Sequence, residues 1–157
     1  MVLGEAVKAA QELRDALAAE VEEARGERNF FRTLDAGALL SRARARAHFN
    51  CRIARLEETL HGALKAAAAE LGIDEVTTAS FAAREPEGAK ALSRAFAEIR
   101  SLSAAMAELD RLNQFLAKRA LRVVTSYVEA IAPSPSTYDR RGLRAAAARR
   151  AMVSSRV

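Results

Sequence analysis

Residues 86–132 read PEGAKALSRAFAEIRSLSAAMAELDRLNQFLAKRALRVVTSYVEAIA, and this stretch decides the fold. Its large apolar residues recur at spacings of three and four, which places them along one face of a single helix. Pro86 suits the first helical position, where its missing N–H is not needed, and Pro133 ends the pattern. At 1.5 Å per residue such a helix is about 70 Å long, so we expect an elongated molecule.

Two more helices are expected before this stretch, over residues 3–34 and 36–71. Asp35 is a suitable N-cap for the second, because its carboxylate can accept the free N–H groups of the following turn. Gly72 suits the left-handed position that closes a helix, and residues 73–85 are predicted to be a loop. The expected core face is Leu3, Val7, Ala10, Leu13, Leu17, Val21 and Ala24 in the first helix, and Leu39, Phe49, Ile53, Leu56, Leu60, Leu64, Ala67 and Leu71 in the second.

The composition favours the same fold class. The chain of 157 residues suits one domain, and no run alternates apolar and polar residues as a half-buried strand does. Thirty-seven residues are Ala, the best helix former. We therefore predict an all-α protein in which residues 1–132 form an elongated antiparallel three-helix bundle or coiled coil. Residues 133–157 are expected to be a flexible basic tail, tethered by proline, with room for a short helix.

The net charge of +5 belongs to the last twenty residues, because residues 1–137 contain 19 basic and 19 acidic side chains. Residues 138–157 contain six arginines and one acid, Asp139. Such a tail could neutralise phosphates and bind nucleic acid without sequence preference. It has one aromatic residue and no lysine, and the neutral body offers no basic face to extend it. The favoured interpretation is an Ala-rich amphipathic segment that packs on the protein or on a partner.

No pattern in the chain indicates catalysis. His48 and Cys51 are three residues apart, a spacing that two metal ligands could use, but His61 falls on another side of the helix. No nucleophile elbow, P-loop or dinucleotide-binding glycine motif is present. We expect no enzymatic activity, no catalytic residue, no metal, no cofactor and no small-molecule substrate.

The expected compartment is the bacterial cytoplasm. The chain starts without a basic segment followed by an apolar one, and it has no run of about 18 apolar residues, so no membrane insertion is expected. The single cysteine, Cys51, cannot form a disulfide within the chain, which agrees with a reducing compartment. Abundant alanine and an excess of arginine over lysine are typical of GC-rich bacterial genomes.

The end of the third helix is more apolar than one seam between neighbouring helices requires. Either these side chains pack in a three-way core, or they form an exposed patch that binds a partner. Asn113 lies on the same seam, where it is either a register-setting residue inside the bundle or a contact to a partner's backbone. The apolar residues are Phe115, Leu116, Leu121, Val123, Val124, Tyr127, Val128 and Ile131.

These features together resemble the FlgN family of flagellar type III export chaperones. The resemblance rests on a long last helix with the run Leu109-Asp110-Arg111-Leu112-Asn113, on the proline break, and on Tyr138-Asp139-Arg140-Arg141-Gly142. It also covers a first helix around Leu13 to Glu20 and a second that opens at Leu34-Asp35.

The resemblance implies a cytosolic chaperone that binds the C-terminal helical segments of hook-associated proteins of the hook-filament junction. The chaperone would deliver them to the cytoplasmic domain of the flagellar export gate. Tyr138, Asp139 and Gly142 would dock on the gate. The client would bind Leu116, Val123, Val124, Tyr127, Val128 and Ile131 as a helix in a groove. The alternative function is a structural homodimeric coiled-coil protein, and a nucleic-acid-associated protein is the less favoured third.

Overall fold

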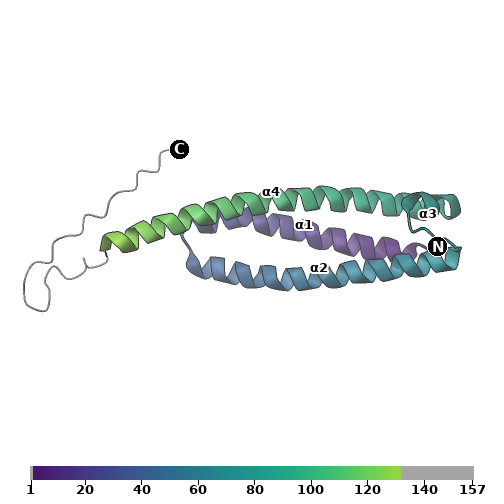
Figure 1. The fold of residues 1–157 in the computed structure, drawn as a ribbon, viewed down its shortest axis with the longest axis horizontal. Helices are drawn as coiled ribbons and strands as arrows, with labels where there is room; N and C mark the ends of the chain where they lie inside the picture. Colours follow the sequence, from purple (N-terminus) through teal and green to yellow (C-terminus); the bar gives the residue numbers. More distant parts are fainter. Residues whose placement is uncertain (1, 132–157) are drawn as a thin grey trace, which may run out of the picture. The chain divides into compact units, whose positions relative to one another are not determined.

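The computed structural model describes residues 2–131, and these residues form four helices and no strand. The helices are α1 (Gly4–Thr33), α2 (Ala36–Leu71), α3 (Thr78–Arg84) and α4 (Pro86–Ile131) (Figure 1). This confirms the predicted all-α class for the described part of the chain. The expected tail, residues 133–157, lies outside it, together with Tyr138, Asp139 and Gly142.

The chain divides into a compact first unit, Met1–Ala120, and a second unit that starts at Leu121. The first unit contains α1, α2, α3 and most of α4. The described part of the second unit is the last portion of α4, residues 121–131.

The predicted helix boundaries are confirmed at three places. The Asp35 carboxylate accepts a hydrogen bond from the N–H of Ala38 at 2.9 Å. Asp35 is therefore the N-cap, and α2 begins directly after it at Ala36. Gly72 has φ +63° and closes α2, as a residue without a Cβ can do at no steric cost. Pro86 is the first residue of α4. Local side-chain chemistry therefore sets these three ends.

The predicted loop over residues 73–85 is wrong for its second half, where α3 forms. The Thr77 hydroxyl caps this helix by accepting the N–H of Ser80 at 3.1 Å. Phe81 is only 1% exposed and packs in the core of the first unit. Phe81 is the only large apolar residue of α3, and one such residue shows no periodicity, so the helix depends on a tertiary contact that the sequence alone does not show.

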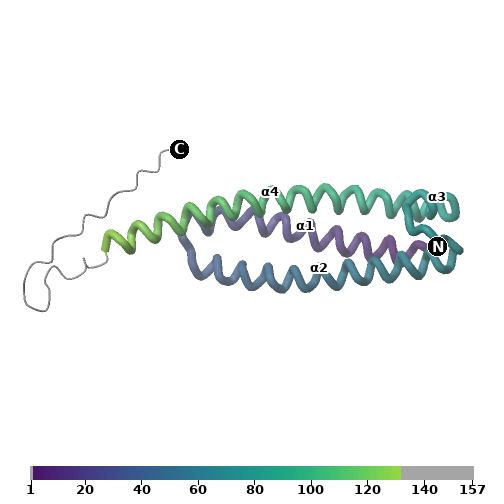
Figure 2. The backbone as a smooth tube through the Cα atoms, viewed as in Figure 1, coloured from purple at the N-terminus to yellow at the C-terminus, as the bar shows by residue number. Residues whose placement is uncertain are grey.

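The main core lies where α1 begins, α2 ends and α4 begins (Figure 2). All seven residues predicted for the core face of α1 are buried. On α2 only Leu60 and Ala67 of the predicted face are buried, and the other six are half-buried. Alanines make up much of the buried face of α1, and their small side chains cover less of the larger residues opposite.

Contacts between helices fix their directions within the first unit. Arg14 and Ala24 of α1 bind Glu98 and Asn113 of α4, so these two helices run the same way. Arg42, near the start of α2, binds Glu20 of α1, while Leu60 and Ala67 pack with the beginning of α1. Helix α2 therefore runs opposite to α1.

Candidate functional site

The most conspicuous surface of the second unit is a row of exposed apolar side chains on α4. At 100° per residue, five of them lie within about 60° of Val124 around the helix, and we call these five the terminal stripe. Its members and their exposed fractions are Leu121 65%, Val124 44%, Tyr127 70%, Val128 55% and Ile131 76%. An apolar row of this kind is typical of a helix face that packs against another helix.

The residues predicted as client anchors are not equally placed. Val123 is 43% exposed and lies about 100° from Val124, at the edge of the terminal stripe. Leu116 belongs to the first unit and is half-buried. Phe115 is 59% exposed but points about 180° away from the stripe. Leu121 was absent from the predicted anchors, although its helical position, three residues before Val124, marks it as a member.

The terminal stripe has the same helical register as the buried face of α4. Counting back from Val124 at 100° per residue, Leu92, Met106, Leu109 and Asn113 fall within the same sector of about 60° to either side. All four are buried in the first unit. The face of α4 that is buried in the first unit thus remains apolar beyond Ala120, but there its side chains are exposed.

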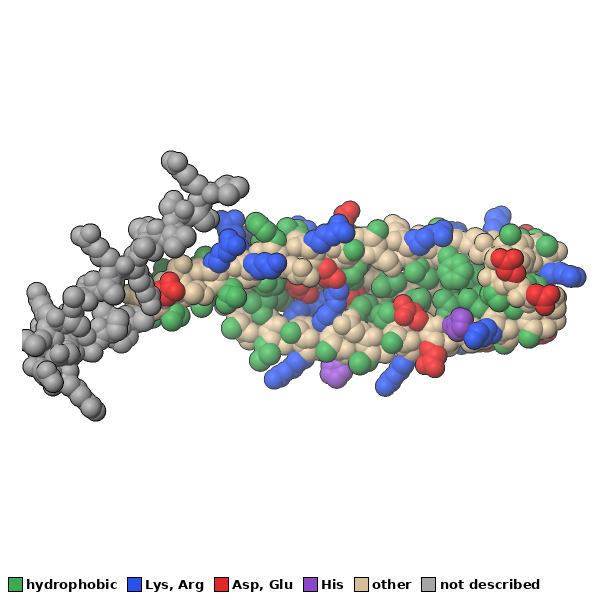
Figure 3. Space-filling model, in the orientation of Figure 1, with side chains coloured by type: hydrophobic (Ala, Val, Ile, Leu, Met, Phe, Trp, Pro, Cys, Tyr) green, Lys and Arg blue, Asp and Glu red, His purple; other side chains and the backbone are tan. Residues whose placement is uncertain are grey.

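A polar network crosses the first unit between its core and its last residues. Its central pair is Glu20 of α1 and Arg42 of α2, which form a buried ion pair. Arg46 extends the network, binding Glu20 at 3.0 Å through Nη1 and Asp110 of α4 at 2.8 and 3.0 Å through Nη2. Charged side chains are visible in the hollow between α2 and α4 (Figure 3). Three helices are therefore joined by one set of charges.

Asn113 joins the same network from α4. Its Nδ2 donates to the carbonyl of Ala24 at 3.0 Å and to Glu27 Oε2 at 2.7 Å. The residue is 6% exposed, so the structure favours the interior alternative for Asn113 over contact with a partner's backbone. Glu27 Oε1 in turn lies 2.9 Å from Arg42 Nε. The network thus contains three carboxylates, two guanidiniums and one amide.

Burial and charge act in opposite directions on Arg42. Burial lowers the pKa of its guanidinium, because a low-dielectric surrounding disfavours the charged form. The hydrogen bond to Glu20 and the charges of Glu20, Glu27 and Glu23 outweigh this and raise the pKa above its ordinary value. Arg42 therefore stays charged and acts as a permanent partner for the buried carboxylates, not as a proton donor.

Sequence reasoning missed this network, although a signal was present. The predicted core face of α2 jumps from Leu39 to Phe49, a longer step than helical spacing allows. The positions that would fill the gap at spacings of three and four are Arg42 and Arg46. Two arginines at core positions require buried acids opposite them, since an unpaired buried charge is strongly unfavourable.

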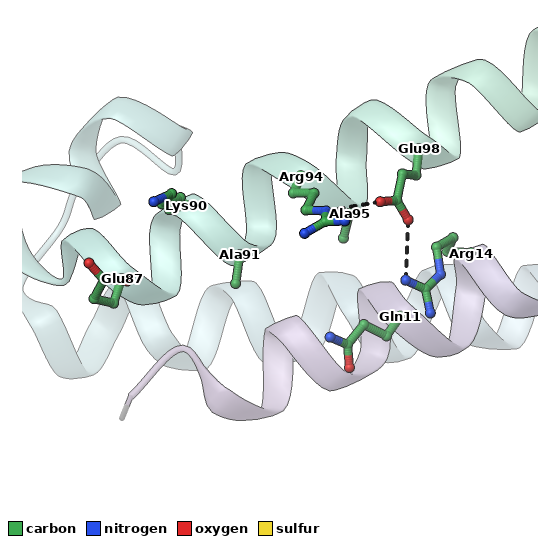
Figure 4. A pocket seen from close by; sticks show the side chains of 8 residues that line it. All are labelled: Gln11, Arg14, Glu87, Lys90, Ala91, Arg94, Ala95 and Glu98. Carbon is green, nitrogen blue, oxygen red and sulfur yellow. Dashed lines mark hydrogen bonds and ion pairs between the residues drawn. The ribbon is translucent and has the colours of Figure 1, made fainter.

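Two hollows accompany these elements in the first unit. One, of about 480 Å³, lies beside the network between α1, α2 and α4, with Leu39, Ala43 and Ala117 among its apolar walls. The other, of about 570 Å³, lies between α1 and α4 (Figure 4). There Glu98 binds both Arg14 and Arg94 at 3.2 Å, so three of the charged side chains of this hollow are paired with one another.

The described residues offer no arrangement for metal chemistry. His48 and Cys51 are both exposed on α2. Within residues 2–131, no three His, Cys, Asp or Glu side chains are grouped to hold a metal ion.

None of the described helices carries an apolar stretch long enough to traverse a bilayer.

The described part of the chain thus combines a buried ionic network in the first unit with an exposed apolar helix end in the second. Exposed apolar patches such as this helix end are typical of interaction sites. Comparison with protein-family models, with curated proteins and with solved structures finds no match for the chain.

Proposed function

We propose that this protein is a cytoplasmic export chaperone of the FlgN type that binds the C-terminal helical segments of hook-associated proteins. In this proposal α1, α2 and α4 form an antiparallel three-helix bundle. The client helix packs on the end of α4, and residues 138–142 dock on the export gate. The Leu-Asn run and the Tyr-Asp-x-x-Gly motif resemble those of the FlgN family, and this resemblance supports the choice of family. The terminal stripe supports the proposed mode of client binding.

The exposure of the terminal stripe is the observation that carries the proposal. Large apolar side chains exposed side by side are unfavourable in water, and such patches are typical of interaction sites. Complete burial of a fully exposed side chain of this kind contributes about 1.5–3 kcal/mol, which is the upper limit for each stripe residue because all are already partly covered. Anchors at spacings of three and four match the helix-in-groove mode, in which two amphipathic helices pack their apolar faces together.

The proposal is tested by analytical ultracentrifugation of the purified chain with a hook-associated protein. We expect a 1:1 complex with the original chain and none with Val124→Glu, since a charge in the stripe would have to be buried. Ser126→Glu is the matched control, because Ser126 is exposed and lies about 160° from Val124 on the same helix. Loss of binding by both variants, or by neither, would contradict the proposed site.

The alternative function, a structural homodimer, gives a different result in the same experiment. A tight dimer of the chain that ignores hook-associated proteins would replace the chaperone proposal. The gate contact is tested separately with Tyr138→Ala, which we expect to reduce export while leaving client binding intact. Loss of client binding in that variant would refute the division between the stripe and residues 138–142.

A further inference from the structure

The first half of α2, which lies wholly within the first unit, is strongly basic. Residues 36–56 contain five arginines and no acid. Arg42 and Arg46 bind the carboxylates of the network, so their charges are already matched. The other three are exposed, and within residues 2–131 none of them forms an ion pair. These three free arginines are Arg44, Arg52 and Arg55.

The free arginines share one face of α2. At 100° per residue all three lie within about 40° of His48 around the helix, and we call these four residues the basic face. His48 is exposed as well. Figure 3 shows basic and histidine side chains projecting from the outer edge of α2. The remaining residues of the same sector between positions 41 and 59 are also exposed, and they are Ser41, Ala45, Cys51 and Thr59.

This distribution of charge differs from that of a face that only keeps a helix in water. Such faces interleave acids with bases, as Arg94 and Glu98 do on α4, where they lie 3.2 Å apart. On the basic face Arg52 and Arg55 are three residues apart, and like charges at this spacing oppose helix formation. Residues 1–137 carry as many acids as bases, but the acids lie outside this stretch. The expectation that the neutral body offers no basic face is therefore wrong for α2.

The side chains between the arginines indicate which anionic partner fits. Protein partners are held mainly by large aromatic or aliphatic anchors, and helices on membrane surfaces insert such side chains into lipid. The sector of the basic face has none. Phosphate groups need only guanidinium and hydroxyl donors, and a guanidinium matches phosphate with two parallel hydrogen bonds. We infer that the basic face binds the phosphate backbone of a nucleic acid duplex, independently of base sequence.

The length of the face suits such a backbone. Arg44 and Arg55 are eleven residues apart, which is about 16 Å along the helix. Duplex DNA carries one negative charge per about 1.7 Å of its axis, so a segment of this length presents about ten phosphates. Each arginine can therefore meet a phosphate of its own. Three such contacts give log K against log salt a slope of about −2.7, or about a 40-fold loss of affinity between about 50 and 200 mM salt.

The test is the binding of a fluorescein-labelled DNA duplex of about 20 bp to the full-length chain, measured by fluorescence anisotropy over a range of salt concentrations. The variant Arg44→Gln/Arg52→Gln/Arg55→Gln removes the three charges. At about 100 mM salt we expect it to bind at least about tenfold more weakly than the original chain, with a slope shallower by about 2–3. The corresponding triple Lys variant keeps the charges and should keep most of the binding. Circular dichroism should show the same helicity for both, because the three side chains are exposed.

The matched control is a triple Gln variant that loses the same charge from α1 and α4. Its positions are exposed and form no ion pair within the described residues, and they are Arg28, Arg100 and Arg111. We expect this variant to bind the duplex within about threefold of the original chain. All variants keep residues 132–157, so the arginines there contribute equally to each. Equal weakening by the two triple Gln variants, weakening by neither, or no binding by the original chain at about 50 mM salt would overturn the inference.

A poly-Glu peptide of the same total charge as the duplex tests for an acidic protein partner instead. Its charges are less dense than those of a duplex, so we expect it to bind at least about tenfold more weakly. Equal or tighter binding of the peptide, lost in the Arg44→Gln/Arg52→Gln/Arg55→Gln variant, would assign the face to an acidic protein and overturn the inference.

This inference goes beyond the proposed function and can fail separately from it. The basic face contains none of the residues proposed to bind the client, so the Arg44→Gln/Arg52→Gln/Arg55→Gln variant should still form the 1:1 complex with a hook-associated protein. If the original chain forms that complex and does not bind the duplex, only the inference is wrong. If it binds the duplex through the basic face and ignores hook-associated proteins, only the proposed function is wrong.

Discussion

Replacing Arg42 with leucine is expected to lower the free energy of unfolding by about 3 kcal/mol. Arg42 is 9% exposed and binds Glu20, whose side chain is 7% exposed, so its loss leaves a buried carboxylate with fewer partners. Breaking a buried ion pair on one side costs about 3–5 kcal/mol. The lower end applies because Glu20 keeps its contact to Arg46 at 3.0 Å. The melting temperature should fall by about 6–12 °C.

Urea denaturation followed by circular dichroism measures this loss, and Arg44→Leu is the matched control. Arg44 is exposed on the same helix, so its replacement should change stability by less than about 0.5 kcal/mol. The double variant Glu20→Leu/Arg42→Leu should lose less than Arg42→Leu, since the Glu20 carboxylate is no longer stranded and Glu27, which loses Arg42 in both variants, keeps its hydrogen bond from Asn113. A loss below about 1 kcal/mol for Arg42→Leu would refute the argument from the network.

Three further predictions concern the first unit. Phe81→Ala should cost about 3–5 kcal/mol in urea denaturation, because this side chain is 1% exposed; a smaller loss would mean that α3 is not held by its core contact. Gly88→Ala should lower the melting temperature, because a Cβ there would lie 2.9 Å from the Cβ of Leu3, which is fully buried and cannot move aside; an unchanged melting temperature would contradict this contact. Hydrogen bonds from Arg14, and to a smaller extent from Arg94, lower the pKa of Glu98 in the folded protein. The stability that Glu98 contributes is therefore present above its unfolded-state pKa of about 4.3, and it is lost as the pH falls through its folded-state pKa. Thermal melts of the original chain and Glu98→Gln should therefore converge in acid, and a difference that persists there would contradict the ion pair.

The sequence predicted the features of the fold that depend on local chemistry. A carboxylate at position 35, a glycine at 72 and a proline at 86 each satisfy or remove backbone groups at a helix end, whatever packs nearby. Helix α3 was missed for the opposite reason. It depends on Phe81 reaching the core and on Glu85 accepting N–H groups of Val2 and Leu3, which are more than eighty positions away.

The candidate site was also predicted only in part, because helical spacing does not show contacts between distant parts of the chain. Helical spacing indicated apolar residues at the end of α4, and the structure finds them exposed. Spacing could not tell that Leu116 is half-buried while Leu121 is exposed, because that depends on where neighbouring helices end. The ionic network was missed because its members lie on three different helices, and only the gap between Leu39 and Phe49 hinted at it.

The position of the network bears on how α1 and α2 are aligned against α4 within the first unit. The apolar face of α4 continues in register beyond Ala120, so apolar contact alone would allow α1 and α2 to pack seven residues further along it. In that register Arg46 would meet Ala117 in place of Asp110, and the Ala24 carbonyl would meet Ala120 in place of Asn113. The observed register pairs Arg46 with Asp110 and the Asn113 amide with the Ala24 carbonyl, and a buried amide left without a partner costs about 1–3 kcal/mol. Within the first unit the network therefore fixes the register of α1 and α2 against α4, as polar residues in coiled coils select one alignment at some expense in stability.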